Sequence, residues 1–211
     1  MIQVKQQISD VSRTLGTRRL EAGEARVATI VQVYDTNLDD LWDAVTSAER
    51  IPRWFVPISG DLREGGRYQL EGHAGGTVTR CDAPHAFDAT WEFNNEVSWI
   101  EVRLTAEGDG RTRFQLEHTA HVTAEMWDQY GPSAVGIGWD SILLGIANNV
   151  AAPGSAITPE EAAAFVASPE GKDFLRQSAD AWAEAAIAAG DDPEQARASA
   201  GRTYDLYTGA A

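Results

Sequence analysis

The sequence has a single cysteine, Cys81, among its 211 residues. No disulfide can form within the chain, so nothing in the fold can depend on one. Such a composition is typical of a reducing compartment, and we expect the protein to be cytoplasmic. Cys81 lies between Arg80 and Asp82, without a histidine or asparagine motif that would indicate a nucleophile, which favours a structural thiol.

Long apolar runs are also absent. No stretch approaches the roughly 18 consecutive apolar residues that a membrane-spanning helix needs. The first eight residues, MIQVKQQI, lack the continuous apolar segment of a secretory signal. We therefore expect neither membrane insertion nor secretion.

Positive charge is scarce. Lysine and arginine together number 17 against 32 acidic residues, which gives a formal net charge of -15. A surface of this sign repels nucleic acids and anionic membranes. The densest basic group is only three arginines between Arg13 and Arg19. Nucleic-acid binding is therefore disfavoured.

Hydrophobic side chains, by contrast, are plentiful. They make up 43% of the chain and include seven Trp, six Phe and five Tyr. This is enough for a substantial core and excludes global disorder. The length fits either one large domain or one domain with an appendage.

The first half of the chain begins with a strand and a broken helix. Residues 24–34 are β-branched and alternate, which predicts a strand, and residues 18–24 offer a hairpin partner that turns at Ala22 and Gly23. Residues 37–46 predict a short helix capped by Thr36 or Asn37. Its apolar face consists of Leu38, Leu41, Trp42 and Val45. Pro52 then begins a second helical turn that ends at Trp54 and Phe55.

From Ile58 to Val122 the pattern changes to short strands separated by turn residues. We expect strands at residues 67–71, 77–81, 87–93, 97–105 and 112–122. One face of residues 87–93 carries Phe87, Ala89, Trp91 and Phe93. This alternation is typical of an antiparallel sheet with one face toward the core.

A long helix follows Gly131 and Pro132. Its apolar stripe over about five turns comprises Val135, Trp139, Ile142, Leu143, Ile146 and Val150. Gly136, Gly138 and Gly145 lie within it, although each costs about 1 kcal/mol relative to alanine. Such glycines indicate either ordinary packing or a close approach of the backbone to the sheet or a ligand.

The last 59 residues are rich in alanine and acidic residues. Pro159, Pro169 and Pro193 each stand at a helix start. The apolar faces of these helices are modest, so we interpret residues 153–211 as a helical C-terminal appendage to a domain at residues 24–152. Residues 1–23 form an N-terminal extension, for which an added strand is one option.

This order of elements resembles the START-like (SRPBCC, Bet v 1-like) superfamily. Its helix-grip fold is an α+β architecture, in which a curved antiparallel sheet wraps around a long C-terminal α-helix. The Trp54–Phe55 pair and the Glu64–Gly65–Gly66 turn are similar to those of the branch named for activators of heat-shock protein 90 ATPase. The resemblance covers residues 24–152. It implies an apolar cavity between the sheet and the C-terminal helix.

The four histidines do not indicate a metal site. His118 and His121 are three apart on a strand and point to opposite faces, so they cannot share a metal ion. We expect no metal and no cofactor. His118 shares a face with Phe114 and Leu116, where it either orients a ligand or is a core histidine satisfied by a neighbour.

Catalytic motifs are missing as well. The sequence contains no Gly-x-Ser-x-Gly elbow and no dinucleotide-binding Gly-x-Gly-x-x-Gly after a strand, and we assign no catalytic residue. The glycine-rich stretch from Gly72 to Gly76 lacks the lysine and helix of a phosphate loop. It is interpreted as a mobile hairpin beside the mouth of the cavity.

Aromatic residues carry the strongest signal for a binding site. Rings line ligand cavities well because they bring large, stiff apolar area, although the same rings can simply fill a core. The predicted ligand-binding residues are Trp42, Trp54, Phe55, Tyr68, Trp91, Phe93, His118, Trp139 and Leu143.

Three functions remain open at this point. The leading hypothesis is cofactor-free binding of a small hydrophobic or amphipathic molecule, such as a lipid or polyketide-like compound. The second is a cyclase- or aromatase-like enzyme that uses His118, Tyr68 and Glu92 or Glu117 for acid–base work. The third is a protein-interaction module resembling a chaperone ATPase activator, with the acidic appendage as contact surface. The sequence leaves the oligomeric state open, a homodimer included.

Overall fold

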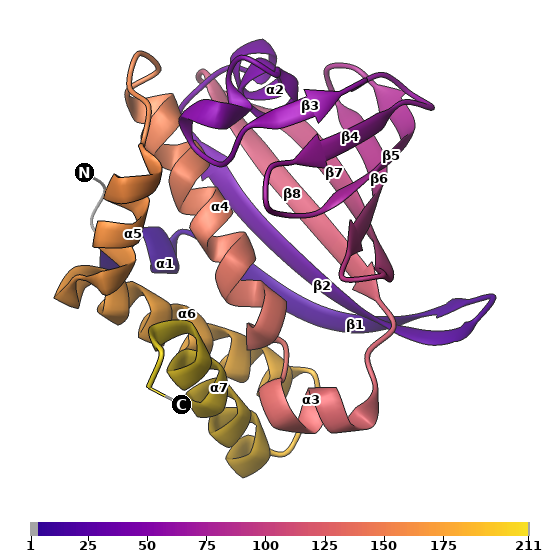
Figure 1. Cartoon of the computed structure of the whole chain (residues 1–211), viewed down its shortest axis with the longest axis vertical. Coiled ribbons are helices and arrows are strands. Elements are labelled where there is room, and N and C mark those ends of the chain that lie inside the picture. The colour runs from indigo at the N-terminus through magenta and orange to yellow at the C-terminus, as the bar shows by residue number, and fades with distance from the viewer. Residues whose placement is uncertain (1–3, 211) are drawn as a thin grey trace. The chain divides into compact units, whose positions relative to one another are not determined.

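The computed structural model describes residues 4–210 of the chain. Its strands form one curved antiparallel sheet in the order β1-β2-β8-β7-β6-β5-β4-β3 (Figure 1). The strands are β1 (Ser12–Leu20), β2 (Gly23–Tyr34), β3 (Ile58–Gly60), β4 (Arg67–Leu70), β5 (Gly75–Asp82), β6 (Ala86–Phe93), β7 (Glu96–Gly108) and β8 (Arg111–Ala120). The helix-grip α+β class that the sequence predicted is confirmed.

The helices fall before, between and after the strands. They are α1 (Val4–Ser9), α2 (Leu38–Thr46), the 3₁₀ turn η1 (Ile51–Arg53), α3 (Ala124–Tyr130), α4 (Ser133–Ala151), α5 (Pro159–Ala167), α6 (Pro169–Ala188) and α7 (Pro193–Thr208). Local signals set most of their starts. Asn37 caps α2, and Pro159, Pro169 and Pro193 each occupy the first turn of their helix, as predicted.

Two short helices were not predicted. α1 lies in the segment that the sequence left as an extension, and α3 precedes the long helix. Each has only six or seven residues, too few to give a clear helical period. Thr123 nevertheless provides a recognisable cap for α3, because its hydroxyl accepts a hydrogen bond from the backbone N–H of Met126 at 3.2 Å.

The contacts divide the chain into two compact units. The first comprises Met1–Ile30, His121–Leu144 and Thr158–Ala211, and the second comprises Val31–Ala120 and Gly145–Ile157. The first unit thus groups the N-terminal segment with the C-terminal helices. The sequence-based boundary between residues 152 and 153 divides the chain differently, and it stays a prediction.

The core of the first unit forms where α6 packs against α1, β1 and α7. Small residues on α6 and α7 let these helices approach closely. The buried cluster consists of Val4, Ile137, Leu144, Phe174, Leu175, Ala179, Ala183, Ala186, Ala196 and Ala200. The alanines that α6 and α7 contribute to this cluster therefore serve helix packing.

A buried ion pair lies beside this core. Arg13 of β1 donates two hydrogen bonds to Asp140 of α4, at 3.1 Å from Nε and 2.8 Å from a terminal nitrogen. Ser178 and Trp182 of α6 donate to the same carboxylate. Burial raises the pKa of Asp140, and the four donors oppose that shift by stabilising its charged form. β1 and α6, which are distant in sequence, are thereby tied to one carboxylate of α4.

The predicted stripe of α4 is corrected in two places. Val135, its first member, is 41% exposed. Ile137, Asp140 and Leu144, which lie off the stripe, are buried. A helix that is buried on more than one side has no single apolar face, so its period alone did not identify these residues.

Replacing Asp140 by alanine should destabilise the protein by about 3–5 kcal/mol, because Arg13 would remain buried without a counter-charge. Urea unfolding followed by circular dichroism measures this. The control is Asp180→Ala on α6, an exposed acid whose loss should stay within about 0.5 kcal/mol. Equal midpoints for the two variants would contradict the structural role of the ion pair.

Candidate functional site

The second unit contains the sheet from β3 to β8, and one face of it is apolar. Strand register shows which side chains share this face, because residues directly opposite in antiparallel strands point the same way. Ala89 of β6 lies opposite Ile100 of β7, which lies opposite His118 of β8. In the next rows Phe87 lies opposite Val102, and Trp91 opposite Ser98. The predicted alternation of β6 is therefore confirmed.

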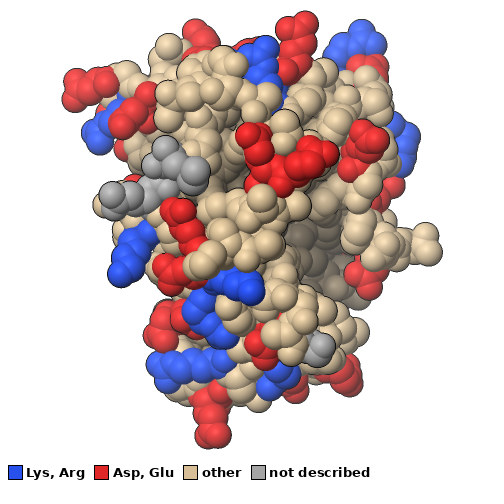
Figure 2. All heavy atoms as spheres, turned by 60° about the vertical axis from the view of Figure 1, so that its left-hand side comes forward, with Lys and Arg blue, Asp and Glu red and all other residues tan. Residues whose placement is uncertain are grey.

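The other face of these strands is polar. Arg103 of β7 pairs with Asp88 of β6 and with Glu101, and Arg67 of β4 pairs with Glu92 at 2.9 Å. Figure 2, which shows a different side of the molecule, likewise has both acidic and basic side chains on its surface. The ion pairs of these strands lie on their polar face, so the opposite, apolar face is the side considered for the candidate site.

Five rings of the second unit form a continuous cluster, which we call the ring cluster: Trp54, Phe55, His73, Trp91 and Phe93. Trp54 stacks on Phe55 with centroids 5.9 Å apart. The His73 imidazole lies 5.3 Å from Phe55, 5.5 Å from Trp91 and 5.6 Å from Phe93. Side chains from the two residues after η1, from the β4–β5 turn and from β6 thereby meet at one place.

Trp42 lies next to this face rather than in the cluster. It contacts Phe87 edge-on, with centroids 6.2 Å apart. Phe87 was expected on the apolar face, but it was not among the predicted ligand-binding residues. Its position follows from the register with Val102.

Tyr68 reaches the same face across a glycine. It lies opposite Gly76 of β5. A Cβ at Gly76 would come within 2.0 Å of the carbonyl oxygen of Thr90, so only glycine fits there. The Tyr68 hydroxyl donates to that carbonyl at 2.7 Å. Burial, and then the charge of Glu92, raise the pKa of Tyr68, so the phenol stays protonated.

His118 is buried, with 6% of its surface exposed, and is hydrogen-bonded to Ser98 at 2.8 Å. Ser98 donates its only proton to the carbonyl of Trp91 at 3.1 Å. Burial lowers the pKa of His118 to about 4, so the ring is neutral at pH 7.

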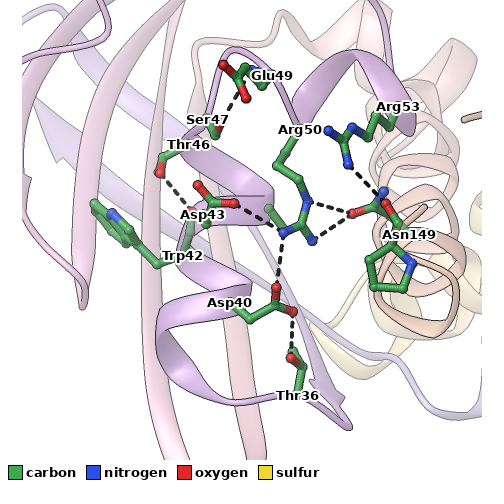
Figure 3. Close-up of polar contacts among 12 residues, drawn as sticks. Thr36, Asp40, Trp42, Asp43, Thr46, Ser47, Glu49, Arg50, Arg53 and Asn149 are labelled. Atoms are coloured by element: carbon green, nitrogen blue, oxygen red, sulfur yellow. Dashed lines mark hydrogen bonds and ion pairs between the residues drawn. The ribbon is translucent and has the colours of Figure 1, made fainter. Parts of the chain in front are cut away.

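Arg50 fixes the turn that presents Trp54 and Phe55. Its guanidinium donates to Asp40 at 3.0 Å and Asp43 at 3.1 Å on α2, and to the Asn149 side-chain oxygen at 3.0 Å on α4 (Figure 3). The Thr36 hydroxyl, followed by Arg50, lowers the pKa of Asp40, so this carboxylate is charged at neutral pH. The network joins α2, η1 and the end of α4.

Two further contacts hold Trp54 in place. Its indole N–H donates to the carbonyl of Ala44 at 2.9 Å. Its own carbonyl lies against Gly145 of α4, where a Cβ would approach that oxygen to 2.5 Å. Close packing against Trp54 thus explains the glycine at position 145. Packing also explains Gly136 in the first unit, where a Cβ would overlap the Trp182 ring at 2.3 Å.

The structure brings together most of the residues predicted for the site. Trp54, Phe55, Trp91 and Phe93 meet in the ring cluster, and Tyr68 and His118 share its face. Trp139 and Leu143 are buried on the part of α4 that belongs to the first unit, and they stay a prediction as site residues. His73 was missed as a member of the cluster, because a turn has no period that reveals where its side chains point.

Within the described part of the chain, no group of three or more potential metal ligands comes together. In that same part no helix is long and apolar enough to cross a membrane.

Comparison with known proteins gives a consistent result. Residues 35–151 match the family described as activator of Hsp90 ATPase homolog 1-like protein. CalU16 from Micromonospora echinospora is 33% identical in its crystal structure, with a TM-score of 0.67 over 84% of this chain and 98% of that one. Its solution structure agrees, at the same identity and TM-score.

A more distant structure shares the fold alone. EF2215 from Enterococcus faecalis, a conserved protein of unknown function, is 13% identical, with a TM-score of 0.59 over 90% of this chain and 96% of that one. No curated protein matches the sequence.

Replacing Gly145 by alanine should destabilise the protein by about 1–3 kcal/mol, because the new methyl group collides with the Trp54 carbonyl. Gly138→Ala in the same helix is the control. There the nearest atom to a Cβ is 3.7 Å away, and the higher helix propensity of alanine should stabilise by up to about 1 kcal/mol. Urea unfolding measures both, and a stabilising Gly145→Ala would refute the close approach.

The stability of the folded protein should also decrease as the pH is lowered, because His118 is buried in its neutral form. In the unfolded chain its pKa is near 6.5, whereas in the folded protein it is about 4. Between pH 6.5 and pH 4 the unfolded state binds a proton at His118 and the folded state does not. The free energy of unfolding is therefore unaffected by titration of this group above pH 6.5, and it decreases as the pH falls toward 4, by roughly 3 kcal/mol at most.

Urea unfolding at pH 7, 5.5 and 4.5 isolates this effect when the wild type is compared with His118→Gln, which keeps a polar group but does not titrate. The wild type should lose more stability than the variant over this range. His85→Gln, at an exposed histidine, should follow the wild type. Parallel curves for wild type and His118→Gln would show that His118 is not buried in its neutral form.

Proposed function

Since the chain belongs to the family of activator of Hsp90 ATPase homolog 1-like proteins, within the Bet v 1-like (SRPBCC) superfamily, we propose that it binds a small hydrophobic or amphipathic molecule. The ligand lies on the apolar face of the second unit, against the ring cluster. Binding needs no cofactor, because apolar contact and a few hydrogen bonds suffice to hold such a molecule.

The observation that carries this proposal is the partial exposure of the ring cluster. Phe93 is 46% exposed, and Trp54, Phe55 and Trp91 are only partly buried. Clustered aromatic side chains that stay open to solvent are unfavourable in water and are common at binding surfaces. A bound apolar molecule would remove this area from water.

The polar groups on this face suit a largely apolar ligand. The Tyr68 hydroxyl is already bonded to the backbone, and His118 is neutral and bonded to Ser98. The cross-strand neighbours on the apolar face of β6, β7 and β8 described above include no ionised side chain. A ligand with few charges therefore meets the lowest desolvation cost here.

The enzymatic alternative gains no support from the groups expected to serve it. Glu92 is engaged by Arg67 and by the hydroxyl of Thr90, on the polar face of the sheet. The Ser98 hydroxyl that is hydrogen-bonded to His118 donates to the backbone carbonyl of Trp91. Acid–base catalysis stays a hypothesis that follows from the fold alone.

Replacing Phe93 by serine should weaken binding of the neutral fluorescent probe N-phenyl-1-naphthylamine about fivefold, because one ring contact worth roughly 1 kcal/mol is removed. The matched control is Val97→Ser on the same hairpin. Val97 is similarly exposed, at 49%, but it lies opposite Glu92 and so on the polar face. Its loss should leave the dissociation constant unchanged.

Fluorescence titration measures both variants, with displacement of the probe by 1-decanol as a test of specificity. Equal weakening by the two substitutions would indicate nonspecific adsorption to the hairpin. Failure of the wild type to bind either compound would refute the proposed function.

A further inference from the structure

His73 is the member of the ring cluster that comes from the turn between β4 and β5. It lies between Gly72 and Ala74 in the β4–β5 connection, and as a residue it is exposed. Its imidazole nevertheless touches three rings at centroid distances of 5.3–5.6 Å. A surface side chain therefore occupies an aromatic environment.

The imidazole fills a space next to the rings of Phe55, Trp91 and Phe93, and we call this space the slot. The ring of Phe93 lies nearly parallel to it, at an interplanar angle of 27°. Phe55 and Trp91 meet it edge-on, at 69° and 70°. One parallel and two perpendicular neighbours are the arrangements that aromatic rings prefer, so the slot suits one flat ring.

The backbone of this turn is held in place. The N–H of His73 donates to the carbonyl of Leu70 at 3.1 Å, and the Gln69 side chain donates to the carbonyl of His73 at 2.9 Å. The N–H of Leu70 donates to the carbonyl of Ala74 at 3.0 Å. Rotation about the side-chain bonds of His73 can therefore vacate the slot without moving the turn, and such rotations are fast at exposed positions.

The chemistry of the imidazole makes it a replaceable occupant. Although the residue as a whole is exposed, partial burial of its imidazole lowers the pKa of His73, so the ring that sits in the slot is neutral at pH 7. A neutral imidazole regains hydrogen bonds to water when it swings out, whereas an apolar ring does not. Exchange is thus favourable for both groups, because the imidazole regains water and the apolar aromatic ring leaves it.

We propose that His73 is a displaceable plug, and that the slot between Phe55, Trp91 and Phe93 takes a planar aromatic ring of the ligand. The inference rests on the proposed function and narrows its ligand class from hydrophobic molecules in general to those with an aromatic ring. An aliphatic ligand uses the apolar face without entering the slot.

The first test compares the wild type with His73→Ala in the full chain. Because the plug competes with the aromatic probe, its removal should tighten binding of N-phenyl-1-naphthylamine roughly fivefold. Binding of 1-decanol, measured by displacement of the probe, should change less than twofold. His85→Ala, at an exposed histidine of another turn, is the control and should bind both compounds like the wild type.

The outcomes separate this inference from the proposed function. If His73→Ala binds the aromatic probe more weakly or with unchanged affinity, His73 is a fixed wall or a bystander, and the plug is refuted while the binding function stands. If neither protein binds either compound, the proposed function falls and the plug with it.

A second test needs no substitution. In the free wild type, ring currents of Phe93 and Trp91 should displace the His73 ring-proton resonances from those of an exposed histidine. Saturation with N-phenyl-1-naphthylamine should move them to the values of an exposed histidine, and saturation with 1-decanol should not. Resonances that keep their position with both compounds would overturn the proposal.

Discussion

The guanidinium of Arg50 is the group on which the arrangement of the candidate site depends. It bonds to two carboxylates of α2 and to Asn149 of α4, and it directly precedes η1, whose end presents Trp54 and Phe55. Arginine suits this position because its planar fork donates in several fixed directions at once. Without that convergence, α2, η1 and α4 would be joined mainly by apolar contacts, which have no preferred direction, and by single hydrogen bonds such as that from Trp54 to Ala44. The network therefore supplies the orientation, and the rings supply the binding area.

The two units use the same physical devices for different ends. In the first unit, Asp140 gathers donors from β1 and α6, and the indole that it bonds, Trp182, is fully buried with its ring against Gly136. In the second unit, Arg50 gathers acceptors, and the indole of Trp54 remains only partly buried although its N–H is satisfied. In the first unit the hydrogen-bonded indole is fully buried, and the arrangement stabilises the fold. In the second unit the hydrogen-bonded indole is partly exposed, and its apolar surface is available to another molecule.

Much of the fold could be predicted because its signals are local. The Asn37 cap, the prolines that open α5, α6 and α7, and the alternation of β6 each involve neighbours within a few residues. The ring cluster was predicted only in part, since Trp91 and Phe93 share a parity while His73 lies in a turn without one. Asp140 escaped notice for a different reason. Its partner Arg13 is 127 residues away, and the role of a charged residue in an apolar helix cannot be predicted until that partner is known.

Composition alone could not separate rings that fill a core from rings that form a site, because both need the same residues. Exposure and partners make the distinction. Phe174 is 1% exposed within the first core, whereas Phe93 keeps nearly half its surface open beside a histidine that is itself at the surface. Among aromatic side chains the histidine loses least on returning to water, since its two ring nitrogens are hydrogen-bonding groups. A cluster made of four hydrocarbon-rich rings and one histidine thus has a single position at which exchange with a guest molecule costs little, and that position is set by the turn between β4 and β5.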